Sequence, residues 1–307
     1  MTVLCSIFIL GIIFLLTDYC VYRIVFYLPQ KKRPDFHNVP ESNLYKAHRE
    51  KMLECVKDME QSPYEEITIQ SKDGYLLYGR LYHVKKDAPL MIFFHGYHGT
   101  FAWDGYGCYK ICKENDINIL MVDERAHGKS DSNVITFGLK ERYDCKLWTE
   151  YAVKRFGENV EIFLAGVSMG AASVLMATEL GLVPNVKGIV ADCGFTSPQD
   201  IIKENIKQMK LPVKPVYVLV KIGAYLFGHF DLVEASSYQA VKGLNIPVLF
   251  IHGEQDSVVP VSMNHALYEA CNGKKSRIII EGADHANSAL TDYGAYKKAV
   301  LEFLREC

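Results

Sequence analysis

The stretch that decides the fold is Gly166-Val167-Ser168-Met169-Gly170. It follows a short apolar run, residues 160–165, and precedes a helix-forming run, residues 171–177. A strand, then G-x-S-x-G, then a helix is the arrangement of a nucleophile elbow, in which a tight turn projects a serine from the top of a sheet. Small residues must flank that serine, and glycine meets this need because it lacks a Cβ. The sequence therefore predicts Ser168 as a nucleophile rather than as a serine in an ordinary glycine-rich turn.

A serine needs a base to activate it, and in this arrangement the chain order is serine, acid, histidine. Residues 276–281 are rich in β-branched side chains and predict a late strand. The strand leads into Gly282-Ala283-Asp284-His285, a loop at a strand's end. We therefore predict His285 as the base.

The orienting acid is expected after the strand that precedes the histidine strand. Residues 246–252 predict that strand, and the loop behind it contains Asp256, the predicted acid. Two other carboxylates stay open. Glu254 shares the loop, and Asp192 ends the predicted strand before it, from where it could also reach the histidine.

An oxyanion hole is the third requirement of this chemistry. The apolar run 89–94 predicts a strand buried on both faces, and it ends in His95-Gly96-Tyr97-His98-Gly99. We predict that the hole combines the N–H of Met169, which follows the nucleophile, with that of Tyr97. His95 and His98 have no third ligand nearby in the sequence, so we interpret them as structural and predict no metal.

Five ordered motifs resemble the α/β-hydrolase superfamily: H-G-x-x-G, D-x-R-x-x-G-x-S from Asp123, G-x-S-x-G, H-G-x-x-D-x-x-V-P and G-x-x-H. Within it, the chain resembles the lid-bearing bacterial hydrolases of the serine-aminopeptidase and monoglyceride-lipase-like group, over residues 60–307. The resemblance implies the same nucleophile, acid, base and oxyanion donors. The group usually has glycine where this chain has Ala126, in a loop that we interpret as structural.

The rest of the chain predicts an α/β architecture. Residues 64–70 alternate like a half-exposed strand, Asp73-Gly74 marks a hairpin turn, and 75–84 form the return strand at one edge of the sheet. Strands then alternate with helices, which favours a mostly parallel sheet covered on both faces. Residues 196–245 interrupt this alternation without a strand. We expect them to form a small helical lid whose apolar face roofs an acyl pocket; a packed excursion without a substrate role is the alternative.

Composition excludes some classes of partner and cofactor. A net charge of −2 gives no basic footprint for nucleic acid. The nine cysteines include no Cys-x-x-Cys pair, and Cys108 and Cys112 lack two further ligands, so neither zinc nor another cofactor is expected. The scattered thiols favour a reducing compartment.

The N-terminus predicts a membrane anchor. Residues 3–28 are strongly apolar apart from Asp18 and Arg23, and a span needs about 20 such residues. A cleaved signal peptide is the alternative, but it should begin with positive charge and end at a small-residue cleavage site. The basic residues lie on the C-terminal side of the apolar stretch, so the positive-inside rule predicts a cytoplasmic hydrolase domain at the cell membrane.

These interpretations divide the chain into an anchor (1–30), a helical linker (31–62) and a hydrolase domain (63–307). We expect a serine hydrolase that acts on acyl esters or thioesters, most simply a carboxylesterase or a lipase-like enzyme. An aminopeptidase-like amide hydrolase and a non-catalytic, membrane-tethered binding protein on the same fold are the alternatives. Removal of residues 1–30 is expected to release the protein from the membrane without impairing turnover of short soluble esters.

Overall fold

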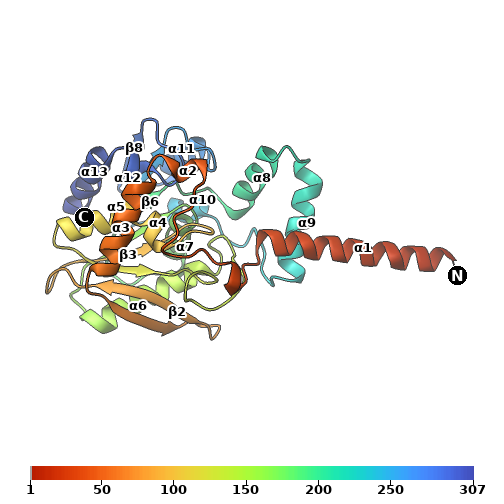
Figure 1. The fold of residues 1–307 in the computed structure, drawn as a ribbon, viewed down its shortest axis with the longest axis horizontal. Coiled ribbons are helices and arrows are strands. Elements are labelled where there is room, and N and C mark those ends of the chain that lie inside the picture. Colours follow the sequence, from red (N-terminus) through yellow and green to blue (C-terminus); the bar gives the residue numbers. More distant parts are fainter. Residues whose placement is uncertain (1) are drawn as a thin grey trace.

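The centre of the molecule is one eight-stranded sheet in the order β1-β2-β4-β3-β5-β6-β7-β8. The structure is a computed structural model that describes residues 2–307 (Figure 1). β2 pairs antiparallel with β1 and β4, and the other neighbouring strands are parallel. The predicted hairpin at one edge of a mostly parallel sheet is thus confirmed. The strands are Glu65–Gln70 (β1), Leu76–Tyr82 (β2), Leu90–Phe94 (β3), Asn118–Val122 (β4), Ile162–Val167 (β5), Val186–Asp192 (β6), Val248–Gly253 (β7) and Lys275–Ile280 (β8).

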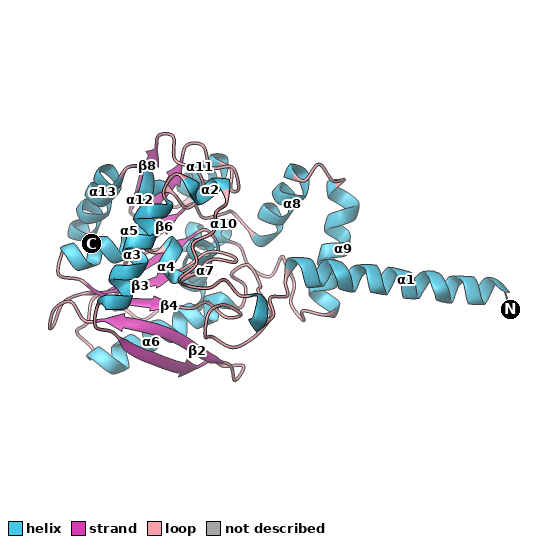
Figure 2. Cartoon of the chain, in the orientation of Figure 1, coloured by secondary structure: helices cyan, strands magenta, loops and turns pink. Residues whose placement is uncertain are grey.

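Helices cover both faces of this sheet, which Figure 2 shows as magenta strands between cyan helices. Alternate residues of a strand point to opposite faces, and in β3 both sets are buried: Met91 packs in one cluster and Ile92 in the other. The first cluster includes residues of α3, α4, α5 and α13, and the second includes residues of α6, α7 and α11. Their bounds are Arg49–Gln61 (α3), Phe101–Asp104 (α4), Tyr106–Glu114 (α5), Glu141–Phe156 (α6), Met169–Ala177 (α7), Val261–Ala270 (α11) and Tyr293–Glu306 (α13).

Short elements complete the domain. The sequence predicts a linker over 31–62, and this stretch contains α3, which buries Met52, Cys55, Val56 and Met59 against the sheet. The remaining short helices are Asn43–Lys46 (α2), Ser288–Thr291 (α12), Gln30–Lys32 (η1), Thr178–Leu180 (η2) and Val241–Gly243 (η3).

The insertion between β6 and β7 is helical, as predicted. It contains α8 (Pro198–Gln208), α9 (Val213–Leu226) and the single turn α10 (Ser237–Ala240). Ser197 caps α8, because its hydroxyl accepts a hydrogen bond from the N–H of Asp200 at 3.1 Å, and Pro198 occupies the first turn. α8 and α9 stand away from the sheet on the side from which α1 projects (Figure 1).

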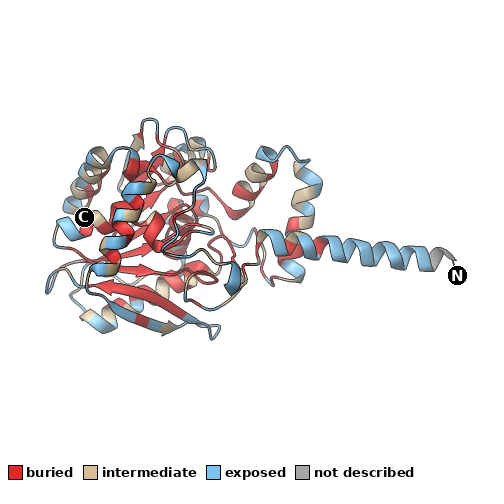
Figure 3. Ribbon diagram, in the orientation of Figure 1, coloured by how far each residue is buried: buried red, intermediate tan, exposed pale blue. Residues whose placement is uncertain are grey.

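The N-terminal helix α1 (Thr2–Val25) has two unlike parts. The large apolar side chains from Ile7 to Leu16 are exposed, whereas Tyr22 and Phe26 are buried in a cluster with Met169. The stretch Cys5–Val25 is long and apolar enough to cross a membrane, and only 11% of its most apolar window is buried. Figure 3 shows the change along the helix, from pale blue to red where it meets α9.

Candidate functional site

Ser168 occupies a strained turn between β5 and α7. Its φ of 55° and ψ of −114° lie in a region that side chains other than glycine rarely adopt. A Cβ on Gly166 would lie 2.4 Å from the backbone of Gly170, and one on Gly170 would lie 2.1 Å from the carbonyl oxygen of Phe94. Both flanking glycines are therefore required by close backbone approach, as the G-x-S-x-G pattern predicts.

The structure brings the predicted base and acid to this serine. Nε2 of His285 lies 3.0 Å from Oγ of Ser168, and Nδ1 of His285 lies 2.8 Å from Oδ2 of Asp256. With the ring proton on Nδ1, His285 donates to the carboxylate and accepts from the serine hydroxyl. The three side chains form a continuous hydrogen-bonded relay in the order that a serine nucleophile needs.

The carboxylate of Asp256 is held on both oxygens. Oδ1 accepts from the N–H groups of Val258 and Val259, at 2.9 and 2.7 Å, so the loop fixes the carboxylate in place. Burial alone would raise its pKa, but the hydrogen bonds from His252 and His285 outweigh burial and bring the pKa of Asp256 below its ordinary value. The acid is therefore ionised at neutral pH.

The two rival carboxylates are engaged elsewhere. Oδ1 of Asp192 accepts a hydrogen bond from Ser288 at 3.1 Å, and burial raises the pKa of Asp192 to about 6. Oε2 of Glu254 accepts from the N–H of Gly282 at 3.2 Å. Of the three candidates, the geometry favours Asp256 as the partner of the histidine.

Two positioning residues next to the relay escape the sequence argument. Nε2 of His252 lies 2.8 Å from the carbonyl oxygen of Val259 and 3.2 Å from Oδ2 of Asp256, so its N–H supports the acid from behind. Oδ1 of Asp284 accepts from both the N–H and the hydroxyl of Ser257 at 2.8 Å, which ties the loop of the acid to the loop of the base. In the sequence, the only signals for these two roles are that His252 shares the H-G-x-x-D motif with the acid and that Asp284 directly precedes the base.

The acid also changes the proton affinity of the base. Burial of the imidazole would lower the pKa of His285, but the hydrogen bond to Asp256 and its negative charge together raise that pKa above 6.5. A raised pKa strengthens His285 as the acceptor of the serine proton in general acid–base catalysis.

The loop after β3 lies beside the elbow, and its amides are arranged by side chains. The N–H of Gly96 donates to Oδ2 of Asp104 at 2.7 Å, and the N–H of His98 donates to Nε2 of His127 at 3.0 Å. These bonds engage the amides on either side of Tyr97. The phenol of Tyr97 donates to the carbonyl oxygen of Val25 at 2.9 Å, which joins this loop to the end of α1.

Ring nitrogens in the same region are occupied by backbone groups. Nε2 of His95 accepts from the N–H of Glu124 at 3.0 Å, and its Nδ1 lies 2.8 Å from the carbonyl oxygen of Gly96. Burial lowers the pKa of His95 to about 4, so the ring is neutral. These contacts give His95 a structural role.

One group of side chains has the spacing of a metal site. Among the described residues, ligand atoms of Cys193, Asp256 and His285 lie within 4.8 Å of one another. Two of them already share the hydrogen bond of the relay, and burial raises the pKa of the Cys193 thiol well above its ordinary value, which disfavours the thiolate that binds metal. The arrangement fits a proton relay better than a metal centre.

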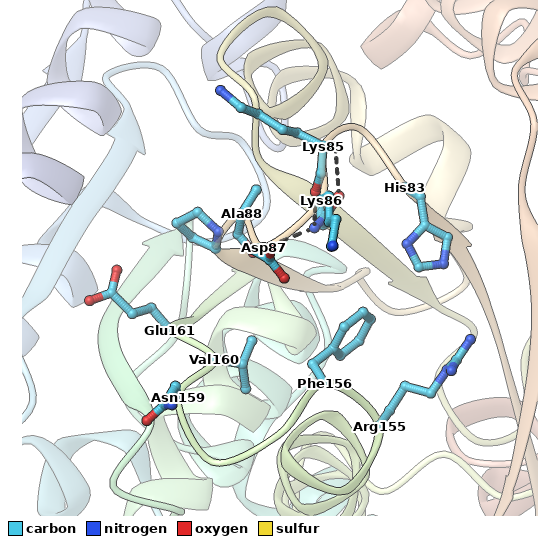
Figure 4. A pocket seen from close by; sticks show the side chains of 12 residues that line it. His83, Lys85, Lys86, Asp87, Ala88, Arg155, Phe156, Asn159, Val160 and Glu161 are labelled. Atoms are coloured by element: carbon cyan, nitrogen blue, oxygen red, sulfur yellow. Dashed lines mark hydrogen bonds between the residues drawn. The ribbon is translucent and has the colours of Figure 1, made fainter.

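A hollow of about 670 Å³ lies at the amino ends of the parallel strands, opposite the ends that carry Ser168. Figure 4 shows it beside His83, Lys85 and Arg155. His83 and Arg155 both pair with Glu65, at 3.4 and 3.0 Å. In open α/β sheets ligands bind at the carboxyl ends of the strands, where Ser168 lies, so we do not interpret this hollow as the reaction site.

Residues 163–286 match the FSH1 serine hydrolase family. Among curated relatives, the uncharacterized protein YqkD of Bacillus subtilis is 29% identical over 61% of this chain. The match spans 62% of YqkD's own length. Protein bem46 of Schizosaccharomyces pombe is 22% identical over 79% of this chain and 77% of its own length.

Solved structures share the fold. The Pyrococcus furiosus esterase Pf2001 superposes with a TM-score of 0.63 at 25% identity, over 81% of this chain and 93% of the esterase. Est1E from Butyrivibrio proteoclasticus, solved with ferulic acid bound, superposes with a TM-score of 0.60 at 22% identity, over 78% of this chain and 99% of Est1E. The predicted fold class is confirmed: the chain has the α/β-hydrolase fold, and the family match together with the esterase neighbour supports a serine hydrolase.

Proposed function

We propose that this chain is a membrane-anchored carboxylic ester hydrolase that works through an acyl-enzyme intermediate. Ser168 is the nucleophile, His285 the general base and acid, and Asp256 the orienting carboxylate. The observation that carries the proposal is the hydrogen-bonded relay, with distances of 3.0 and 2.8 Å, that starts at a strained serine elbow.

Each step uses groups that are already in place. Neutral His285 takes the proton of the Ser168 hydroxyl as Oγ attacks the acyl carbonyl carbon, and the carbonyl oxygen becomes an oxyanion. The imidazolium, stabilised by Asp256, then gives that proton to the leaving alkoxide as the ester bond breaks. Water then attacks the acyl carbon and loses a proton to His285. As the bond between the acyl carbon and Oγ breaks, His285 returns that proton to Oγ, so the acid leaves and the serine hydroxyl is regenerated.

The N–H groups of Met169 and Tyr97 are the proposed oxyanion donors. Support comes from the engaged amides of Gly96 and His98, which leave that of Tyr97 between them. Met169 begins α7, so its N–H lies at the positive end of a helix dipole. Loss of one such donor typically costs about 10²–10³-fold in rate.

An acyl substrate is supported by the surroundings of the elbow. Met169 belongs to a buried cluster with Phe137, Phe195 and Val220, the last of which lies on α9 of the lid. The lid insertion and this apolar cluster are the grounds on which we place the chain with the lid-bearing serine-aminopeptidase and monoglyceride-lipase-like group.

The anchor is proposed to remain attached to the mature protein. The end of α1 is buried: Phe26 is fully covered, and the N–H of Ile135 donates to its carbonyl oxygen at 2.8 Å. Cleavage after this point, as for a signal peptide, would remove core residues. Arg33 donates to carbonyl oxygens of the loop 127–132, so the chain beyond the anchor is also fixed to the domain.

The test compares wild type with Ser168→Ala, both full-length in detergent. A fluorophosphonate probe is expected to label only wild type, and turnover of soluble acyl esters should fall about 10⁶-fold in the variant. An unchanged melting temperature shows that the variant is folded. Residual activity close to wild type would overturn the assignment of the nucleophile.

The two alternatives are separated by the same assays. A non-catalytic binding protein would fail to react with the probe at all. Peptidase activity on free N-termini would require an acid for the amine; Glu204 and Asp231, two acids of the lid insertion, lie 3.3 Å from Lys207 and 3.9 Å from Lys221. Acyl esters of graded chain length, with aminoacyl amides alongside, decide between ester and amide chemistry.

A further inference from the structure

The solvent-exposed face of α9, called the outer face of the lid below, carries both large apolar side chains and lysines. On α9, Val218 is 53% and Tyr225 68% exposed, and Lys214 and Lys221 lie on the same stripe at helical spacing. Met209 and Leu211, in the turn before α9, are also exposed. Large apolar side chains gathered on one exposed helix face usually mark an interaction surface.

α9 is packed directly against the membrane-spanning candidate. At Gly223 an added Cβ would lie 3.1 Å from Cβ of Tyr22 and 3.3 Å from the carbonyl oxygen of Asp18, so glycine permits the two helices to cross closely. The ring of Phe227 lies 5.1 Å from that of Tyr19. Figure 1 shows α9 running across α1.

This packing sets the depth of α9. The candidate span Cys5–Val25 includes Asp18 and Tyr22, the residues that α9 contacts. The buried Asp18 faces this contact rather than the outside. With the span in a bilayer, α9 therefore lies within about 10 Å, or two helical turns, of the end of the span at Val25, next to the membrane–water interface. Tyrosines such as Tyr19 and Tyr225 are typical of that level.

The charge of the lid complements an anionic surface. Residues 203–226 contain five lysines and one glutamate, although the whole chain has a net charge of −2. Lys207, Lys210, Lys214 and Lys221 are exposed. Two of them also lie near acids at the surface, Lys207 at 3.3 Å from Glu204 and Lys221 at 3.9 Å from Asp231, and such exposed pairs hold a lysine only weakly. Amphipathic helices with lysine on the polar flank and aromatic or aliphatic residues on the other bind in the interface plane of anionic membranes.

We propose that the α8–α9 lid docks its outer face, centred on Lys214, Val218, Lys221 and Tyr225, onto the anionic headgroups of the bilayer that α1 spans. The lysine side chains extend toward phosphate, and the apolar side chains enter the headgroup–acyl boundary. The proposal rests on the proposed function for its consequence: the ester substrate is then a lipid-like molecule presented by the same bilayer. The docking itself requires no turnover.

The test places a fluorophore on the lid of the full-length protein. Trp103 and Trp148 are buried, so Tyr225→Trp adds an exposed reporter. The control is Tyr64→Trp, at a tyrosine that is 36% exposed and comes just before β1, an edge strand of the sheet. Both are made in the Ser168→Ala background and reconstituted in nanodiscs of phosphatidylcholine with and without phosphatidylglycerol, with brominated lipid as quencher.

Quenching is expected for Tyr225→Trp and not for Tyr64→Trp, and more with phosphatidylglycerol. Each lysine contributes about a fivefold preference for an anionic surface, so Lys214→Gln with Lys221→Gln should weaken that preference up to about 25-fold, while Lys85→Gln with Lys86→Gln leaves it unchanged. Equal quenching of the two reporters, or equal quenching in neutral and anionic discs, overturns the proposal. If neither iodide in the water nor brominated lipid quenches the emission of Tyr225→Trp, another protein covers this face. That result also overturns the proposal. None of these results bears on whether Ser168 is the nucleophile.

Discussion

The carboxyl ends of the parallel strands, which carry Ser168 and are called the sheet edge below, and the layer that covers them are held together by different interactions. The edge is assembled from loops after successive strands, and each of its groups is fixed by short hydrogen bonds such as the 2.8 Å contact of His285 with Asp256. The cover combines α9 of the lid with the end of α1, and rings such as those of Phe26 and Phe230, 5.1 Å apart, hold it together. Substitutions at the sheet edge should therefore lower kcat much more than substitutions in the cover.

A hydrogen bond of a tyrosine joins the two regions. The hydroxyl of Tyr97, on the loop of the sheet edge, donates to the carbonyl oxygen of Val25 in the cover. The ring of Tyr97 stacks on that of Phe137 at 4.9 Å, and Phe137 in turn meets Phe26 at 5.9 Å. The N-terminal helix, which we propose as the anchor, thus also supports the proposed oxyanion loop.

After the nucleophile itself, the largest effect is expected at the acid. Asp256→Asn should lower kcat about 10⁴-fold, because the base then loses the carboxylate that fixes its tautomer and stabilises its charged form. Asp192→Asn, which alters the bond to Ser288 instead, should cost far less. Steady-state kinetics on one soluble ester ranks the two variants. The opposite ranking would make Asp192 the acid.

The pH profile measures the same pair. Attack requires neutral His285, whose pKa is raised above 6.5, so kcat/KM should rise with pH through that pKa and fall about tenfold per unit below it. Asp256 raises the pKa of His285, so the acidic limb of the kcat/KM profile should move to lower pH in Asp256→Asn. A limb that stays in place would show that another group controls the titration.

The sequence predicted the sheet edge well and the cover poorly, for a physical reason. Ser168, Asp256 and His285 each follow a strand within a short motif, and parallel strands bring their carboxyl ends together, so local patterns were sufficient to predict that these side chains meet. Their catalytic roles stay a prediction. His252 and Asp284 stand inside these motifs, but their contacts with Val259 and Ser257 depend on how two loops pack, which the motifs do not specify. Hydropathy also treats α1 as uniform, because it cannot distinguish the exposed apolar side chains between Ile7 and Leu16 from those, such as Tyr22, that face the protein.

A smaller effect is expected where the two regions meet. Tyr97→Phe removes the bond to Val25 but keeps the ring and the backbone N–H; a net hydrogen bond of about 0.5–1.5 kcal/mol predicts a roughly 2- to 12-fold lower kcat with little change in KM. The control is Tyr82→Phe, which loses a similar bond to the carbonyl oxygen of Met59 at 3.3 Å, far from the elbow. If both variants lower stability alike and neither changes kcat, Tyr97 is structural only.

The smallest effect is expected in the exposed part of α1. Deletion of residues 1–17 removes the side chains that face outward and keeps Tyr22, Phe26 and Leu28, so kcat/KM for a short soluble ester should stay within about twofold of wild type, since surface changes are usually worth under about 0.5 kcal/mol. The protein should move to the soluble fraction on centrifugation.

Deletion of residues 1–28 is the matched comparison, and here the buried contacts revise the expectation drawn from the sequence for removal of 1–30. Losing a buried aromatic side chain typically costs about 3–5 kcal/mol, and this deletion removes Tyr22 and Phe26 together. That is a large share of the roughly 5–15 kcal/mol by which proteins are stable. The melting temperature and ester turnover should therefore both fall sharply. Two deletions with equal stability and equal turnover would mean that α1 is a tether throughout, and that the cover needs only the lid.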